Sequence, residues 1–397
     1  MICLSLRQLS ALFFCIILIG CQSSPSTNGK TSTVARGYQP EPDTDEAGLW
    51  LVMDQAEKDL ITSGKLITDV RVTEYLRQVI CRLSNDICED VRIYVVRIPY
   101  FNATMAPNGV MQIWSGLLLR TENEAQLAYI LAHEIAHYRY QHSLQIFRQA
   151  KTTANVLAPF QVVTIAGGVS YVGSLAQIGA VGTLMKFSRD HEREADNGGF
   201  EMAVAAGYNP HESAKVWEGL EEEKDALDES APSLFLSTHP SSGERVDTLK
   251  QRAIAATKPG NGWITGADRY NEVIDPLRFQ LMSDELRLRR FPATQILLDR
   301  AADAGLRVSE IKFFQAELYS ARAEKDDTSK AEAAYRECLK HPDAPPEAYR
   351  ELAMIYMKSG RGQQALPLFE NYLAQKPDAF DRSMVKAYIQ RIDSEDN

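Results

Sequence analysis

The chain is short of the features that mark nucleic-acid-binding and membrane-spanning proteins. Lys and Arg number 43 against 53 Asp and Glu, so the net charge is −10, and the basic residues form no cluster. We therefore expect no nucleic acid among its partners. No uninterrupted apolar run approaches the roughly 18 residues that a transmembrane helix needs. With 397 residues, 45% of them hydrophobic, the chain is long enough for about two domains with real cores.

Cysteine is scarce as well. Beyond Cys21 the chain has only Cys81, Cys88 and Cys338, and none of them has zinc-ligand spacing. In an oxidising compartment Cys81 and Cys88 can form a disulfide that closes a small loop, or they can be two small core residues. The sequence leaves both open. Cys338 is expected in the core, on a helix.

The first part of the chain has the pattern of a targeting segment. Arg7 is its only charged residue before Lys30, and Ala11–Ile19 is a run of nine apolar residues. Such a run is too short to span a bilayer and is typical of a signal peptide.

The end of this segment, Leu18-Ile19-Gly20-Cys21, resembles the lipobox of bacterial lipoproteins. The resemblance implies that residues 1–20 are a cleaved signal peptide and that Cys21 carries the lipid that anchors the protein to a membrane. Gln22, where an Asp would imply retention at the inner membrane, implies a periplasmic protein anchored to the outer membrane. Residues 21–45 are rich in Ser, Thr, Pro and Gly and are expected to form a flexible tether.

The next segments predict helices followed by a small sheet. Glu46–Thr62 and Thr73–Leu83 have amphipathic helical spacing. Val91–Ile98 is β-branched and predicts a strand, and Phe101–Trp114 predicts a hairpin that turns at Asn108-Gly109. In the hairpin, Phe101, Asn102 and Ala103 can offer a free edge to which a peptide substrate adds as a strand, or they can serve plain sheet packing.

The most informative stretch lies within Leu127–Ser143, where His133, Glu134 and His137 form the motif H-E-x-x-H. Thr121-Glu122-Asn123-Glu124 resembles a capping box and predicts that a helix starts at about residue 122. On a helix the two His lie one turn apart on the same face, where they can hold Zn²⁺. Glu134 then lies where it can take a proton from a water activated by the metal.

A catalytic zinc site needs a third protein ligand. Glu192 and Asp196, in the run Ser188–Asp196, are spaced i, i+4 on a further predicted helix. Glu192 can bind the metal, and Asp196 can accept a hydrogen bond from the free ring nitrogen of a ligand His.

These motifs together resemble the gluzincin metallopeptidases. The spacing of 55 residues from His137 to Glu192, and the string S-R-x-x-E-x-E-A-D from Ser188 to Asp196, resemble the HtpX/Ste24 group and its β-barrel assembly-enhancing (BepA-like) proteases. The resemblance implies one Zn²⁺ per chain in a zincin-type domain and points to Glu192, rather than Glu194, as the ligand.

The resemblance also implies that His239, in Ser237-Thr238-His239-Pro240, lies over the zinc. It can be a fourth ligand of a latent enzyme or can donate a hydrogen bond to the oxyanion. Arg245 is expected to support this loop through charge-assisted hydrogen bonds. Glu194 is expected to be structural or solvent-facing, and His191 to be a surface residue. The sequence gives no role to His142, His211 or His341.

The segment between the two motifs, 152–185, has no charged residue but is interrupted by polar residues, Pro and Gly. It predicts a helical hairpin packed over the catalytic domain, or alternatively a segment that touches lipid or covers the site as a lid.

The tail resembles a tetratricopeptide array. Ala365, Phe369 and Tyr372 fit marked positions of that repeat, and 34 residues earlier stand Ala331, Tyr335 and Cys338. Such an array offers a concave surface to peptides or partner proteins.

We therefore predict a mostly α protein with a small β-sheet: a zinc metallopeptidase domain over residues 46–260 and a helical repeat domain over 270–397. By resemblance, its substrates are unfolded or misassembled outer-membrane proteins, and the repeats contact them or the outer-membrane barrel assembly machinery. One alternative is a chaperone or assembly scaffold with a largely latent protease site. Another, a lipid-facing protease, would need the transmembrane helices that are missing here.

Overall fold

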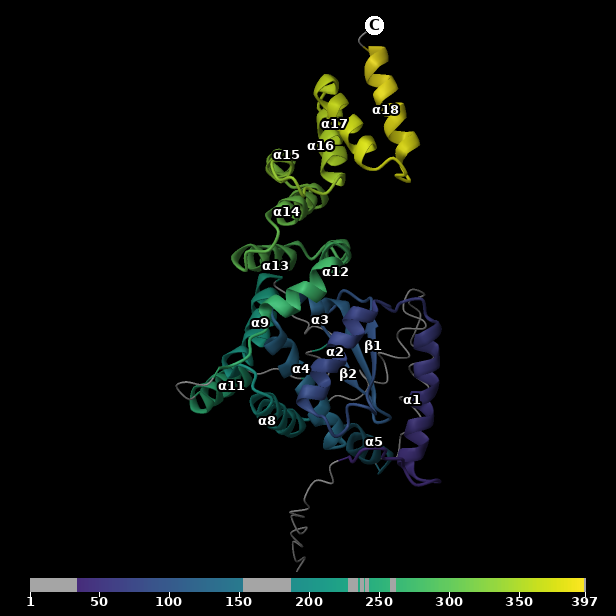
Figure 1. Ribbon diagram of the computed structural model, residues 1–397, viewed down its shortest axis with the longest axis vertical. Coiled ribbons are helices and arrows are strands. Elements are labelled where there is room, and N and C mark those ends of the chain that lie inside the picture. The colour runs from purple at the N-terminus through teal and green to yellow at the C-terminus, as the bar shows by residue number, and fades with distance from the viewer. Residues whose placement is uncertain are drawn as a thin grey trace, which may run out of the picture. The chain divides into compact units, whose positions relative to one another are not determined.

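The computed structural model describes residues 34–152, 187–227, 235, 239, 243–257 and 262–395 (Figure 1). The expected signal peptide, Cys21, most of the tether and residues 153–185 lie outside the described residues, so these predictions stay open. As predicted, the protein is mostly helical with one small sheet. Within the described ranges, no helix combines the length and the apolar character needed to cross a membrane.

Two helices begin the described part, as predicted. Helix α1 (Asp45–Thr62) starts at Thr44, whose side chain accepts a hydrogen bond from the Ala47 N–H. Helix α2 (Val70–Leu83) starts three residues earlier than expected because the Asp69 carboxylate accepts from the Arg71 N–H. A disulfide between Cys81 and Cys88 ties the end of α2 to the loop before the sheet, which decides between the two alternatives for this pair.

The sheet has three strands in the order β1-β3-β2: β1 (Arg92–Val96), β3 (Val110–Trp114) and β2 (Ala103–Met105). Strands β1 and β3 are parallel, and β2 pairs with β3 as the predicted antiparallel hairpin. Gly109 turns this hairpin at a φ of 85°, and a Cβ there would lie 2.7 Å from the Asp90 carbonyl oxygen. The turn therefore requires glycine.

The metal-motif helix α4 (Glu124–Arg139) follows the short α3 (Ser115–Arg120) and begins two residues later than predicted. Asn123 caps it by accepting from the Gln126 N–H, whereas the Thr121 hydroxyl bonds to Leu117 and Tyr270. Thr121 is therefore not the cap that the sequence suggested. All but the last residue of α4 are buried, so its polar side chains must find partners inside the protein.

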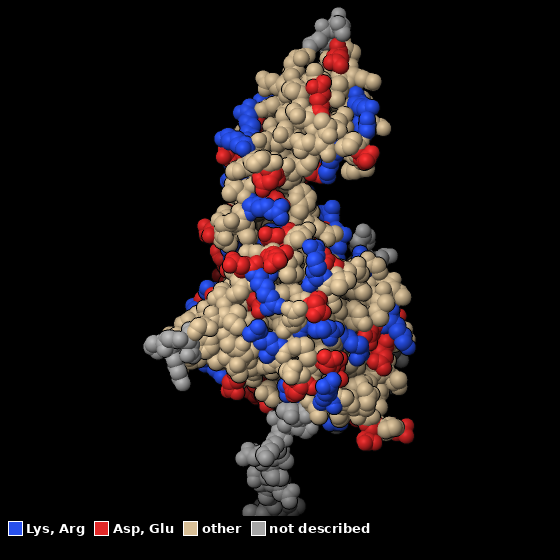
Figure 2. All heavy atoms as spheres, viewed as in Figure 1, with Lys and Arg blue, Asp and Glu red and all other residues tan. Residues whose placement is uncertain are grey.

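After α4 the chain continues through α5 (His142–Thr152) and, past the undescribed segment, α8 (Arg189–Ala205). A 3₁₀ turn (Pro210–Glu212), α9 (Lys215–Ala226) and α11 (Gly243–Ala256) complete the region around the motifs. On the described part of the face in Figure 2, acidic and basic residues are interspersed.

Helix α12 (Ala267–Arg287) packs against α2, α3 and α4. Its anchor is a buried ion triad in which the Arg120 guanidinium donates to Glu223 of α9 and Glu285 of α12, at 2.9 Å each. A buried charge of this kind is tolerated only when it is paired. The triad therefore holds α3, α9 and α12 together.

The remaining helices form consecutive pairs (Figure 1). In α15 (Asp327–Cys338) and α17 (Gly362–Gln375), the residues spaced 34 apart are all buried at equivalent places. This is consistent with a tetratricopeptide array, which stays a prediction. The other helices of this region are α13 (Phe291–Asp303), α14 (Val308–Arg322), α16 (Glu347–Lys358) and α18 (Arg382–Glu395).

Glu317, on α14, makes the stability of this region depend on pH. Burial raises the pKa of Glu317 from 4.5 to about 7, although the Tyr335 hydroxyl donates to its carboxylate. Its stabilising contribution is therefore present below about pH 4.5 and is lost as the pH rises through about 7. We expect Glu317→Gln to flatten this dependence, with a gain at pH 8 of at most about 3 kcal/mol in the free energy of unfolding.

Thermal unfolding of both forms between pH 5 and pH 8 checks this. Glu324→Gln, which removes an exposed carboxylate near the end of the same helix, is the control and should follow the wild type. Parallel pH curves for Glu317→Gln and wild type would show that Glu317 is not buried as described.

Candidate active site

Helix α4 brings His133 and His137 together as the sequence predicts. Both side chains are buried, and their Nε2 atoms lie 3.0 Å apart. Burial lowers the pKa of His137 well below its usual range, which favours the neutral imidazole that a metal ion requires.

Helix α8 supplies Glu192 to the same point. Its carboxylate oxygens lie 3.4 Å from His137 Nε2 and 3.6 Å from His133 Nε2. Burial alone would raise the pKa of Glu192, but the nearby His239, together with hydrogen bonds from His137 and His239, brings it well below its usual range. Glu192 is therefore an anion inside the protein.

His239 completes the cluster. Its Nδ1 lies 3.0 Å from Glu192 Oε1 and 3.3 Å from His133 Nε2, and its ring stacks on Phe235 at 4.4 Å. Four ligand atoms, one each from His133, His137, Glu192 and His239, lie within 4.8 Å of one another. Ligands held at about 2.1 Å around a tetrahedral zinc ion are about 3.4 Å apart, so the set fits one Zn²⁺.

The close approach of α8 to α4 depends on Gly199, which the sequence reading overlooked. A Cβ at this position would lie 2.8 Å from the backbone nitrogen of His133. Gly198-Gly199 inside a helix costs conformational entropy, and such a pair signals tight packing. Here the packing lets the acidic residues of α8 reach the imidazoles of α4.

Asp196 and Arg245 lie behind His133. Asp196 Oδ1 is 3.0 Å from His133 Nδ1, the nitrogen that faces away from the cluster. Arg245 donates to Asp196 and, at 3.2 Å, to Glu192, while its guanidinium lies 3.6 Å from the centre of the Trp217 ring. The arrangement can hold His133 in one tautomer.

The sequence assigns no role to His142, but the structure places it against the ligand residue His137. His142 is completely buried, and its Nδ1 lies 2.9 Å from His137 Nδ1. Its Nε2 lies 3.2 Å from Glu194 Oε2, and His191 stacks on its ring at 4.5 Å. Spacing of five residues from His137 places His142 off the ligand face of a continuous helix. In the structure the helix ends at Tyr140, and Gln141 follows with a φ of 53°. This break brings His142 next to His137.

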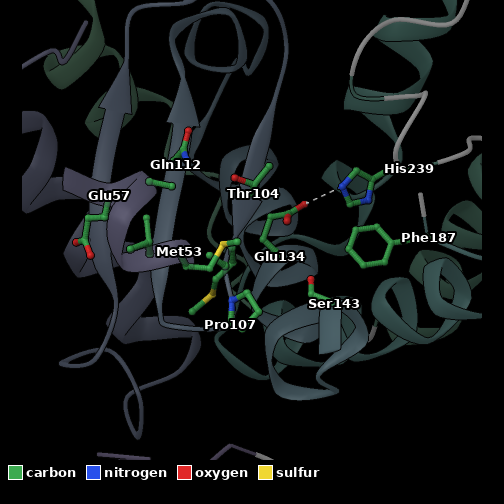
Figure 3. A pocket seen from close by; sticks show the side chains of 13 residues that line it. Met53, Glu57, Thr104, Pro107, Gln112, Glu134, Ser143, Phe187 and His239 are labelled. Carbon is green, nitrogen blue, oxygen red and sulfur yellow. Dashed lines mark ion pairs between the residues drawn. The ribbon is translucent and has the colours of Figure 1, made fainter. Parts of the chain in front are cut away.

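Glu134 faces a pocket beside the cluster (Figure 3). Its Oε1 lies 3.8 Å from His239 Nε2 and has no hydrogen-bond partner within the described ranges. Burial raises the pKa of Glu134, which suits a group that accepts a proton. The other side chains that line the pocket are mostly apolar and include Met53, Met105, Pro107 and Phe187.

Strand β2 lies at the edge of the sheet, and its Thr104 lines the same pocket. Ala103 is the first residue of the strand, and Asn102 precedes it, with its carbonyl oxygen accepting from the Trp114 N–H. Among the described strands, β2 pairs only with β3. Asn102 and Ala103 are buried, at 2% and 0% exposure, so the role of this edge in binding a peptide stays a prediction.

This geometry defines a zincin-type metallopeptidase site, and the family comparison agrees. Residues 69–253 match the model of peptidase family M48. Over 209 residues the chain is 26% identical to the β-barrel assembly-enhancing protease of Yersinia pestis, covering 49% of this chain and 42% of the relative. Over 160 residues it is 29% identical to the mitochondrial metalloendopeptidase OMA1 of Schizosaccharomyces pombe, covering 40% and 45%. The chain thus spans less than half the length of these curated relatives.

We expect Gly199→Ala to push α8 away from α4 and to weaken both folding and metal binding. Overpacking of this kind costs about 1–3 kcal/mol in the free energy of unfolding. Thermal unfolding and a zinc titration measure the two effects.

Gly48→Ala on α1 is the matched control because no atom lies within 4 Å of the added Cβ, and it should be neutral or slightly stabilising. If Gly199→Ala unfolds and binds zinc like this control, the close approach does not constrain the site.

Proposed function

We propose that the protein is a zinc-dependent endopeptidase. The observation that carries the proposal is the buried set of His133, His137 and Glu192 beside Glu134, in an M48 domain. An ordinary structural zinc site would have no use for a buried carboxylate facing a pocket next to the ligands. Here Glu134 faces both the pocket and the cluster.

In the proposed mechanism, each side chain has one task. His133, His137 and Glu192 would hold the zinc ion, which would supply a Lewis acid at this point. Glu134 accepts the proton of the attacking water and returns it to the leaving amine. Asp196 holds the tautomer of His133, and Arg245 supports Asp196 and Glu192.

Strand β2 is proposed to hold the substrate backbone. Asn102 and Ala103 are buried in this structure, so a peptide can add there as a strand only after the residues that cover them move. It would then run past Thr104, which lines the same pocket as Glu134. The apolar lining of the pocket favours an apolar substrate side chain next to the scissile bond. Unfolded proteins expose both an extended backbone and apolar side chains.

His239 is proposed to be a fourth ligand that keeps the enzyme latent. Its Nδ1 faces Glu192 and His133 at ligand spacing, which supports this role over that of an oxyanion donor. A catalytic zinc site needs an open position, and His239 fills it. Substrate binding would have to displace this ring before Glu134 can act.

We further propose that the protein acts in the bacterial envelope. The lipobox at Cys21 supports a periplasmic location with a lipid anchor in the outer membrane. The likeness to β-barrel assembly-enhancing proteases supports unfolded or misassembled outer-membrane proteins as substrates. The helix pairs after α13 are then the surface that contacts these substrates or the barrel assembly machinery.

The closed ligand set also favours a second candidate function. If His239 is not displaced in the cell, the protein acts as a chaperone or assembly scaffold, and its helical tail does the binding. The two functions differ in whether the cellular phenotype needs Glu134.

We expect Glu134→Gln to bind one zinc per chain like the wild type but to lose cleavage of an unfolded outer-membrane protein by about 10²-fold or more. The reason is that glutamine keeps the shape of the side chain but cannot accept the proton. Metal analysis and electrophoresis of the cleavage products, for both proteins side by side, give the answer.

Equal cleavage by both forms would remove Glu134 from the mechanism. Absence of zinc from both forms would show that the metal assignment is wrong. A knockout strain complemented with Glu134→Gln separates the two functions, since only the scaffold function survives this substitution.

We expect His239→Ala to retain zinc and to cleave faster than the wild type because the substitution opens the fourth position. The initial rate on the same unfolded substrate is the measurement. His211→Ala, which removes an exposed imidazole, should leave the rate unchanged. A slower His239→Ala enzyme would instead favour the oxyanion role.

A further inference from the structure

His142 and Glu194 lie on the side of His137 that faces away from the metal cluster. His137 presents Nε2 to His133 and Glu192, and its Nδ1 points to His142 Nδ1 at 2.9 Å. The other nitrogen of His142 points to Glu194 at 3.2 Å. Both nitrogens of a completely buried imidazole are thus engaged, one of them by a ligand residue.

The direction of each hydrogen bond follows from metal binding. A ligand imidazole uses the lone pair of one nitrogen for the metal and carries its proton on the other. His137 binds through Nε2, so its Nδ1–H must donate, and His142 Nδ1 must accept. His142 therefore carries its proton on Nε2, and this N–H donates to the Glu194 carboxylate.

We propose that His142 and Glu194 form a relay that fixes the tautomer of His137 and strengthens it as a zinc ligand. The inference rests on the proposed function and extends it. The Glu194 carboxylate lies 3.2 Å from His142 Nε2, and as a hydrogen-bond acceptor it polarises His142 and makes His142 Nδ1 a better acceptor. The electron density that His137 offers to the metal rises accordingly.

The relay gives each of the two ligand histidines of α4 a carboxylate of α8. Asp196 bonds directly to His133, and Glu194 reaches His137 through His142. Glu192 binds the metal itself. The three acidic residues of the Glu192–Asp196 run therefore act on three parts of one site: the metal, His133 and His137. His142 connects Glu194 to His137, which the Glu194 side chain does not contact itself.

The environment of His142 keeps this geometry rigid. Its ring lies between His191, stacked at 4.5 Å, and the His137 ring at 4.9 Å. Tyr140 packs at 5.6 Å on the same ring. A rotamer change of His142 would have to displace these neighbours, so the relay is held in place before metal binds.

The first test measures the zinc affinity of the metal-free full chain by competition with a chromogenic chelator. We expect His142→Leu to weaken binding by about 10–100-fold, the range seen when partners of metal ligands are removed. Glu194→Gln should cause a smaller loss of about 3-fold or more, because glutamine accepts the hydrogen bond without the charge. The visible bands of Co²⁺ bound in place of zinc should shift in both variants, since they report the strength of His137 as a ligand.

A double-mutant cycle distinguishes a relay from a nearby charge. If Glu194 acts through His142, then Glu194→Gln adds no further loss of affinity once residue 142 is Leu. An undiminished loss in that background would overturn the relay. So would a zinc affinity and a Co²⁺ spectrum of His142→Leu equal to those of the wild type.

Two further variants keep the test decisive. If His142→Leu fails to fold, His142→Asn replaces it, because its amide oxygen can accept from His137 but its side chain does not reach Glu194. It should behave like Glu194→Gln, and wild-type affinity in both would overturn the relay. Glu201→Gln, an exposed acid of α8 paired with Arg252, should bind zinc like the wild type, and a loss there equal to that of Glu194→Gln would count against the relay.

The readout is independent of proteolysis. If the wild type binds zinc tightly and does not cleave, the proposed function fails, while the affinity series still decides on the relay. If the wild type cleaves and all the variants bind zinc with the wild-type affinity, the relay fails and the proposed function stands.

Discussion

The site depends on an anionic carboxylate buried among imidazoles. Moving a carboxylate out of water costs several kcal/mol unless positive charge or hydrogen-bond donors replace the water. Around Glu192 these are the donors of Arg245 and the nitrogens of His137 and His239. A divalent ion held by the same residues would add positive charge to this compensation. The packing of α4 against α8 and the metal site are therefore one stabilising arrangement.

The sequence predicts the parts of the site that are encoded by local spacing. His133, Glu134 and His137 follow from one helical turn, and Glu192 and Asp196 follow from another, because the helix geometry itself determines which residues share a face. The hairpin also follows from its Asn108-Gly109 turn, since only glycine fits the backbone there. At these places the geometry is determined by neighbouring residues, and expectation and structure agree.

Contacts between elements were harder to predict. The sequence gives no signal for the positions of His142 and Glu194, because these depend on the break between α4 and α5 at Gln141, a non-glycine residue with a positive φ. The start of α4 was misplaced because Thr121 is engaged by Tyr270, 149 residues away. In contrast, Gly199 did leave a signal, since a glycine pair inside a helix is costly and therefore has a packing reason.

Helix α9 shows how structure remote from the zinc ligands supports them. At one point Glu223 is held in the buried triad with Arg120 and Glu285. Nearer its start, Trp217 lies against the Arg245 guanidinium and packs at 5.5 Å on Phe235, the ring on which His239 stacks. Arg245 and Phe235 therefore take their positions from a helix whose own position is held by the triad. Arg245 contacts Glu192 and Asp196, and Phe235 packs on His239. Helix α9 therefore supports both the α8 carboxylates and His239.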